Sequence, residues 1–103
     1  MKNADSAKAM ARNAARAEAM LRQLAHAGRL MILCGLAEGE KSVGELEDIT
    51  GMSQSAVSQH LTRLKDAGLV DAERRGRRIY YRLCSVPARA ILSTLYLIYC
   101  PPK

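Results

Sequence analysis

Apolar and polar residues alternate with the period of a helix through most of the chain, starting at its N-terminal segment, residues 1–25. Asp5 or Ser6 can cap a helix over residues 5–25. Apolar residues recur there at intervals of four and three, a narrow seam suited to packing on another helix. The seam consists of Met10, Ala14, Ala17, Leu21 and Leu24. We predict a dimerisation helix; the alternative is a solvated helix packed only on its own domain.

A second helix is expected over residues 29–37. Gly28 breaks the preceding pattern, and Gly39 ends the new one. One face of this helix is apolar at the spacing i, i+3, i+4, i+7. That face consists of Leu30, Leu33, Cys34 and Ala37.

A helix-turn-helix is expected over residues 42–67. Its first helix, over 42–50, opens with Ser42 and Glu45 at the spacing of a capping box. A three-residue turn containing glycine follows, and Ser53 is placed to cap the next helix. Two helices joined by such a turn are typical of DNA-binding proteins.

The two faces of the helix after Ser53 differ in an unusual way. Val57, Leu61 and Leu64 form an apolar stripe at i, i+4, i+7. A solvated opposite face is commonly rich in Lys and Glu, whereas this one carries short, uncharged hydrogen-bonding groups. Such groups suit a helix pressed against base edges in the major groove. They are Ser55, Ser58, Gln59 and Thr62.

Residues 69–83 are expected to form a two-stranded hairpin, or wing. Ile79, Tyr81 and Leu83 alternate with polar or aromatic neighbours at the period of a half-buried strand. The hairpin tip concentrates arginines around one glycine, and like charges at this density repel one another unless they face an anion. The arginines are Arg74, Arg75, Arg77 and Arg78. The alternative is a solvated loop.

A last helix is expected over residues 86–100, with Ser85 as its cap and Pro87 in its first turn. An apolar stripe runs along one side of this helix. The stripe consists of Ala88, Ile91, Leu92, Leu95, Ile98 and Tyr99. The predicted fold class is therefore mainly α with a two-stranded β-wing: one winged helix-turn-helix domain over residues 1–103.

Composition supports one small domain with a polyanionic partner. The 103 residues include no Trp or Phe, so a partner subunit could bury apolar surface that a modest core leaves open. A net charge of +6 suits nucleic acid or an anionic membrane. Bases gather in residues 63–82, beside the polar helix face, which favours DNA. The N-terminus does not resemble a secretion signal, and an odd number of cysteines, 3, suits a reducing cytoplasm.

The chain resembles the ArsR family of small dimeric winged-helix repressors over about residues 20–100. The stretches AHAGRLMILCGL, SVGEL, SQSAVSQHLTRLKDAGLV and RRGRRIYYRL carry this resemblance. It implies a homodimer whose first helix and last helix, over residues 86–100, form the interface. This dimer would bind an inverted-repeat operator, with the helix after Ser53 in the major groove and the wing on flanking backbone. The residues expected to contact double-stranded DNA are Gln54, Ser55, Ser58, Gln59, His60, Thr62, Arg63, Arg74, Arg75, Arg77 and Arg78.

Within the family, Cys34 and Cys100 resemble the paired cysteines of the BigR/SqrR persulfide-sensing branch. The resemblance implies release from DNA when a persulfide links the two through a disulfide or polysulfide bridge. The stretches GELEDIT and ARAILSTLYLIYC lack the ligands of the family's arsenic-type and zinc-type sites. No cofactor or resident metal is expected, and no spacing predicts an enzyme.

Several alternatives stay open at this point. The repressor could sense a thiophilic metal or a general oxidant, or the domain could contact protein or RNA instead. Cys34 could be a buried small hydrophobe. Cys84 is expected to fill space, with a third thiolate for a soft metal as the alternative. His60 could donate to a phosphate, pack beside the wing or bond within the domain; His26 is expected at a helix start.

Overall fold

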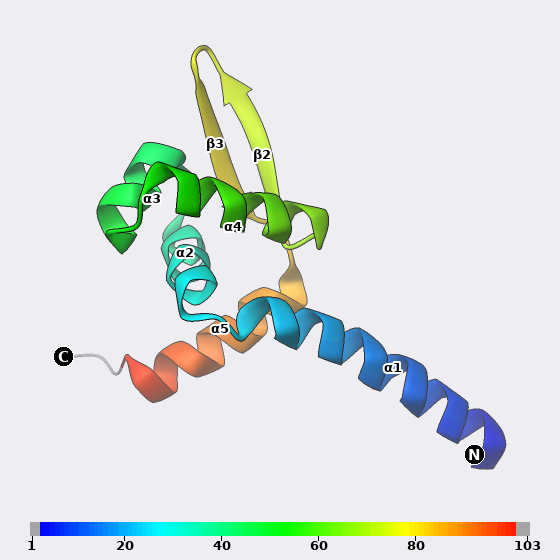
Figure 1. Ribbon diagram of the computed structural model, residues 1–103. Coiled ribbons are helices and arrows are strands. Elements are labelled where there is room, and N and C mark those ends of the chain that lie inside the picture. The colour runs from blue at the N-terminus through cyan, green and yellow to red at the C-terminus, as the bar shows by residue number, and fades with distance from the viewer. Residues whose placement is uncertain (1–2, 101–103) are drawn as a thin grey trace.

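The computed structural model describes residues 3–100 and shows a helical body from which a two-stranded hairpin projects (Figure 1). The predicted order of four helices, a hairpin and a final helix is confirmed, with one short strand added. The elements are α1 (Asn3–Leu24), α2 (Ala27–Glu38), β1 (Lys41–Ser42), α3 (Val43–Thr50), α4 (Gln54–Asp66), β2 (Val70–Arg75), β3 (Arg78–Leu83) and α5 (Val86–Tyr99). The fold is the predicted winged helix-turn-helix.

Side-chain caps set the starts of the helices. Ser42 accepts a hydrogen bond from the backbone N–H of Glu45, whose carboxylate accepts from the Ser42 N–H in return, so the predicted capping box is confirmed. Ser53 and Ser85 cap α4 and α5 as predicted. His26 caps α2, so that helix starts two residues earlier than expected.

Gly28 lies inside α2 and does not interrupt the helical pattern, which corrects the sequence prediction. It is buried where α2 passes α4, and an added Cβ would stand only 3.0 Å from Nε2 of His60. The glycine is therefore required by a close approach of two helices and not by a chain break.

The three-stranded sheet has the order β1-β3-β2 and is antiparallel throughout. In the wing, Val70 pairs with Leu83, and Arg75 pairs with Arg78 at the tip. On the other side of β3, the two residues of β1 pair with Tyr80 and Tyr81. The segment that leaves α2 is thus hydrogen-bonded into the base of the wing.

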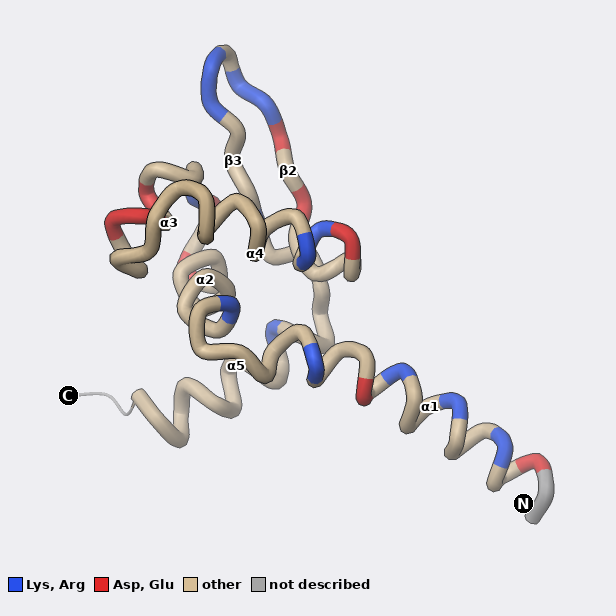
Figure 2. The backbone as a smooth tube through the Cα atoms, in the orientation of Figure 1, with Lys and Arg blue, Asp and Glu red and all other residues tan. Residues whose placement is uncertain are grey.

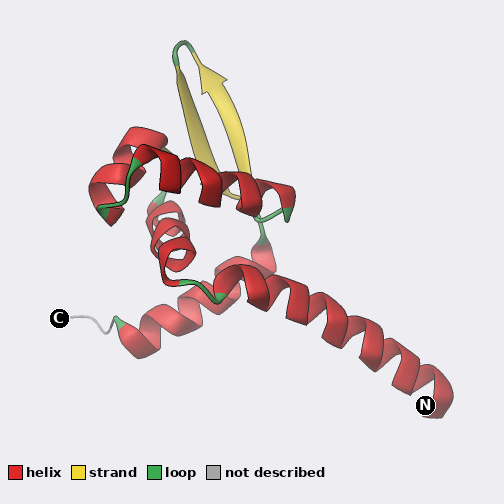
Figure 3. Ribbon diagram, viewed as in Figure 1, coloured by secondary structure: helices red, strands yellow, loops and turns green. Residues whose placement is uncertain are grey.

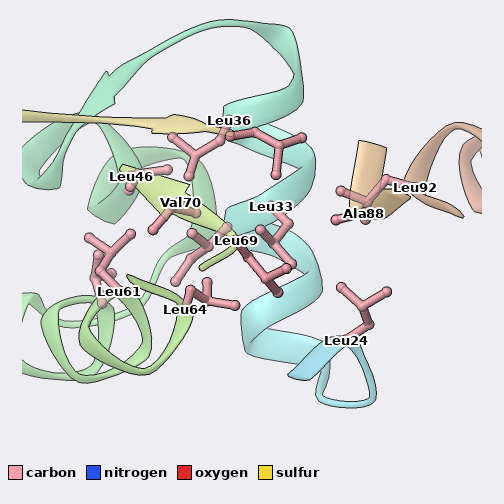
Figure 4. Close-up of a cluster of buried hydrophobic side chains, with 13 residues drawn as sticks. Leu24, Leu33, Leu36, Leu46, Leu61, Leu64, Leu69, Val70, Ala88 and Leu92 are labelled. Atoms are coloured by element: carbon pink, nitrogen blue, oxygen red, sulfur yellow. The ribbon is translucent and has the colours of Figure 1, made fainter. Parts of the chain in front are cut away.

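The core is a cluster of branched aliphatic side chains centred on α2 (Figure 4). The face of α2 that faces the core is rotated relative to the prediction: Leu33 is buried, Leu30 and Ala37 are half-buried, and Cys34 is exposed. Fully buried residues of α2, α3 and α4 meet in this cluster. They are Ile32, Leu33, Leu36, Leu46, Val57, Leu61 and Leu64.

Helices α1 and α5 extend away from this core in different directions (Figure 3). Leu24 is the one buried member of the predicted α1 seam; Met10 is 72% exposed and Leu21 50% exposed. On α5, Ala88 and Leu92 are buried, but Ile98 and Tyr99 at the far end are open. Neither helix covers its apolar residues within one chain. Along residues 3–100, no helix is long and apolar enough to cross a membrane.

Candidate nucleic-acid interface and thiol pocket

The outer face of α4 is polar, uncharged and open. Burial of Val57, Leu61 and Leu64 fixes the rotation of the helix. This rotation exposes the side chains at the N-terminal half that can meet base edges. Exposed positions are Gln54, Ser55, Gln59, Thr62 and Arg63, with Ser58 half-buried. The outline in Figure 2 shows that α4 carries no charge until its C-terminal end.

The turn before α4 is held rigidly. Gly51 adopts φ 74°, a left-handed conformation that favours glycine, and its N–H donates to the carbonyl of Glu47. The Thr50 hydroxyl donates to the carbonyl of Leu46 at 2.6 Å and accepts from the Met52 N–H at 3.2 Å. These bonds fix the direction in which α4 leaves α3.

The wing tip presents cations on both strands, but its four arginines are not equivalent. Within residues 3–100, Arg74, Arg77 and Arg78 form no ion pair with a carboxylate. Gly76 reverses the chain between the strands with φ 64°. In Figure 2 the blue segments gather at the end of the hairpin farthest from the core. Three guanidinium groups are thus available to phosphates.

Arg75 is engaged within the chain. Its guanidinium donates to both carboxylate oxygens of Glu40 and, at 2.7 Å, to Glu73, and it lies 4.9 Å from the Tyr80 ring centre. Hydrogen bonding to Arg75 lowers the pKa of Glu40 and raises that of Arg75. The sequence suggested four equivalent tip arginines; the structure ties this one to the segment after α2.

His60 lies on the inner side of α4. Its ring is tilted against that of His26, with the centroids 4.7 Å apart, and its Nδ1 is buried without a hydrogen-bond partner. Burial lowers the pKa of His60, and the neighbouring His26, Arg29 and Arg63 lower it further. The ring therefore packs at the start of α2 and not beside the wing. Its contact with DNA stays a prediction.

Cys34 of α2 and Cys100 at the end of α5 line one hollow of about 580 Å³ between α2, α3 and α5. Both thiols are free and exposed. The space between them is bounded mainly by the apolar side chains of Met31, Ile49, Leu92, Tyr96 and Leu97. We call this hollow the thiol pocket.

The Cys34 thiol is held in its neutral form. Its pKa is raised by partial burial, then by the negative potential of Cys100 and of Glu38. A raised pKa lowers the thiolate fraction at neutral pH and so slows reaction with general oxidants.

Cys84 lies apart from this pair and does not fill space in the core, contrary to the sequence prediction. It is exposed, and its Sγ lies 3.6 Å from the carbonyl oxygen of Gly68. Across the described residues, no three His, Cys, Asp or Glu side chains gather closely enough to hold a metal ion. The thiol therefore links the segment after β3 to the turn between α4 and β2.

Arg89 is a residue that sequence reasoning missed. Its guanidinium donates to the carbonyl oxygens of Ala37, at 3.4 Å, and Leu83, at 3.5 Å. It therefore joins the start of α5 to the ends of α2 and β3. No local pattern marks it, because both partners are backbone groups of other elements.

Comparison with known proteins agrees with this geometry. A family model described as bacterial regulatory protein, arsR family, matches residues 26–72. The biofilm growth-associated repressor of Agrobacterium fabrum is 43% identical over 95 residues, 92% of this chain and 81% of that protein. The structure of reduced HlyU from Vibrio cholerae matches with a TM-score of 0.87 at 40% identity, covering 90% of this chain and 98% of that one. The transcriptional repressor BigR from Xylella fastidiosa matches with a TM-score of 0.84 at 38% identity, covering 99% and 100%.

Proposed function

This chain belongs to the ArsR family of bacterial regulatory proteins and is a DNA-binding transcriptional repressor similar to BigR, and we propose that persulfides release it from its operator by linking Cys34 to Cys100. The family assignment decides against the protein- or RNA-interaction module that the sequence left open. It also identifies the chain as a regulator and not an enzyme.

We place α4 in the major groove and the wing on the adjacent backbone. The uncharged face of α4 supports this placement, because it offers short donors and acceptors where a helix would meet base edges. Arg74, Arg77 and Arg78 have no carboxylate partner in the described chain and can neutralise phosphates. Arg75 then fixes the orientation of the hairpin relative to the segment after α2 through its ion pair with Glu40, and does not bind DNA itself.

Members of this family bind DNA and act as dimers. The open apolar residues of α1 and α5 support a homodimer through these two helices, because one chain leaves them exposed. A two-fold axis would set the two α4 helices ~34–36 Å apart, or a multiple of that, on an inverted-repeat operator. We expect a bacterial repressor that binds chromosomal DNA to act in the cytoplasm, because the chromosome lies there.

The main evidence for the sulfur switch is that two exposed thiols, one from α2 and one at the end of α5, line the same pocket. A persulfide RSSH transfers its outer sulfur to one cysteine, giving Cys–SSH and releasing RSH. The second thiol then attacks the inner sulfur of Cys–SSH, forming Cys34–S–S–Cys100 and releasing hydrogen sulfide. A second sulfur transfer before closure gives a longer bridge.

A covalent link would reach the DNA-binding surface through the path that joins α2 to the wing. Glu38 ends α2, and β1 begins three residues later, paired with β3. Arg89 ties α5 to both elements, and α5 also belongs to the proposed dimer interface. A bridge that pulls α5 toward α2 would thus change both the wing angle and the spacing of the two α4 helices.

Operator binding by reduced and persulfide-treated protein tests this switch. Treatment with glutathione persulfide is expected to weaken binding of wild-type protein and of Cys84→Ser, the matched control, but to leave Cys34→Ser and Cys100→Ser bound. Mass spectrometry should find the Cys34–Cys100 link. If persulfide still releases both serine variants from the operator, the Cys34–Cys100 assignment is refuted. Arsenic retained on the protein after arsenite treatment would favour a thiophilic-metal sensor, and release from the operator by peroxide would favour a general oxidant sensor.

A further inference from the structure

The thiol pocket has an unbalanced charge. Glu38, at the end of α2, is the single charged side chain among its described lining residues, and no lysine or arginine of residues 3–100 lines it. Most of the remaining wall is hydrocarbon. Charged sulfur donors therefore meet no counter-ion there, whereas an apolar donor gains by leaving water.

The pocket and the exposed far end of the proposed dimer stripe lie on different sides of α5, although Leu92 belongs to both. Leu92, Tyr96 and Cys100 line the pocket at successive steps of four residues. Ile98 lies two residues from both Tyr96 and Cys100, on the opposite side of the helix, and is open to solvent. A partner chain packed on the side of Ile98 leaves the pocket side of α5 facing α2.

The negative charge acts on the reacting sulfur itself. Glu38 lies near enough to Cys34 to raise the pKa of that thiol. An approaching anion feels the same carboxylate beside a largely apolar wall, where solvent screens charges less than in open water. Repulsion therefore applies to donors whose carboxylates must come within a few ångströms of Cys34.

We propose that the thiol pocket reacts preferentially with uncharged, apolar sulfane-sulfur compounds, of which dialkyl trisulfides are the test class, and that Glu38 is the residue that slows reaction with anionic donors such as glutathione persulfide. This selectivity presupposes the Cys34–Cys100 switch proposed above. It goes further by naming the chemical class of inducer and a specificity-determining side chain.

The reaction needs no oxidant besides the donor. One cysteine thiolate attacks the central sulfur of R–S–S–S–R, breaking one S–S bond, forming Cys–S–S–S–R and releasing RS⁻. The second cysteine thiolate then has two sulfurs to attack. Attack on the former central sulfur expels RS⁻ and keeps the extra sulfur in the bridge, whereas attack on the Sγ of the first cysteine expels R–S–S⁻ and leaves a plain disulfide. When the bond to the terminal sulfur breaks, the product is Cys34–S–S–S–Cys100. The two cysteines are oxidised in this reaction, and the trisulfide donor is reduced.

The test compares two donors with the same reacting group and different charge. Diethyl trisulfide and glutathione trisulfide are each reacted with the full-length protein, and bridged product is followed by mass spectrometry. Each rate is divided by the rate of the same donor with N-acetylcysteine amide, an uncharged reference thiol. We expect the corrected rates to favour diethyl trisulfide by about tenfold and high salt to narrow that preference.

Glu38→Gln should cut the preference several-fold, and Glu38→Lys should lower it further or reverse it. Glu47→Gln, which removes the same charge from α3 outside the thiol pocket, is the control and should keep the wild-type ratio. The ratio is the readout because a changed Cys34 pKa alters both rates alike.

Equal corrected rates in the wild type, or an unchanged ratio in both Glu38 variants, would overturn the selectivity. Bridging by both donors without preference would leave the sulfur switch standing. Absence of any Cys34–Cys100 link with these donors and with glutathione persulfide would overturn both proposals.

Discussion

At the scale of single residues, the neighbours of Cys34 decide how it reacts. Its position on an apolar stretch of sequence is compatible with a buried, inert thiol. In the structure it is exposed at the rim of a pocket, yet its pKa is raised by partial burial and by Cys100 and Glu38. The partial burial of Cys34 and its shared pocket with Cys100 could not be assigned from sequence, because α2 and α5 pack together although they lie far apart in the chain.

The first prediction concerns the pH at which Cys34 becomes reactive. In a protein with Cys84 and Cys100 replaced by serine, alkylation by iodoacetamide should rise with pH around a midpoint above that of a free cysteine, since burial and Glu38 still raise the pKa. Adding Glu38→Gln should move the midpoint to lower pH. Peptide mass spectrometry of quenched samples measures both; a midpoint at or below that of free cysteine would contradict the burial effect.

His60 provides the second prediction, on stability. Its pKa is lowered from 6.5 in the folded chain by burial and by neighbouring positive charge, so the unfolded chain takes up its proton first. The contribution of the neutral His60 ring to the free energy of unfolding is therefore complete above pH 6.5. It is lost as the pH falls toward the lowered pKa that His60 has in the folded chain. Urea unfolding between pH 7.5 and 5 should show this loss, and His60→Gln should reduce it.

The matched variant for His60 is His26→Gln, which removes one source of positive charge near the ring while leaving a side chain that can accept hydrogen bonds. It should flatten the same pH dependence in part. An identical slope in the wild type and in His60→Gln would show that another group titrates in this range.

At the scale of elements, local signals predicted the helices and the wing well. Ser42, Ser53 and Ser85 each cap a helix where the sequence placed a start, since capping depends on residues within one turn. Strand β1 was missed because two residues carry no period of their own and become a strand only by pairing with Tyr80 and Tyr81. The core face of α2 was misjudged because the helix is surrounded by α1, α3, α4 and α5.

The candidate DNA-binding surface was only partly predictable for the same reason. The polar face of α4 follows from helix period alone. The helix period does not reveal which wing arginines are paired with carboxylates. Arg75 meets Glu40 only in the folded chain, because the two residues are 35 positions apart in the sequence.

The wing supplies the third prediction. Arg77→Ala should weaken binding to specific and random DNA alike and lower the slope of log affinity against log salt by about 1, because one phosphate contact is lost. Arg75→Ala should change the slope less, since its charge is already balanced by Glu40 and Glu73. Fluorescence anisotropy over a salt series measures both slopes; equal reductions would show that Arg75 also reaches a phosphate.

At the scale of the whole molecule, the structure is extended, 54 × 35 × 20 Å, because α1 and α5 leave the core. The sequence predicted a narrow apolar seam on the first helix that suits packing against another helix. It could not show that the seam stays open within one chain, which depends on the direction in which α1 projects from α2.

The fourth prediction follows from those open faces. Leu21→Glu and Ile98→Glu each place a charge on an exposed apolar position, 50% and 61% exposed in the single chain. Each should shift the protein from dimer to monomer in analytical ultracentrifugation with little change in circular dichroism. Met31→Glu, at 43% exposure beside the thiol pocket, is the control and should stay dimeric. A dimeric Leu21→Glu, Ile98→Glu double variant would exclude this interface.

The pairing of β1 with β3 has a consequence for the timing of a sulfur response. If bridged thiols disfavour DNA through that junction, equilibrium reciprocity requires DNA to disfavour the bridge by the same factor. Promoter-bound copies would then be protected from sulfuration while unbound copies are consumed first. The pool of spare repressor would act as a buffer, setting how much sulfur stress the cell tolerates before the gene is switched on.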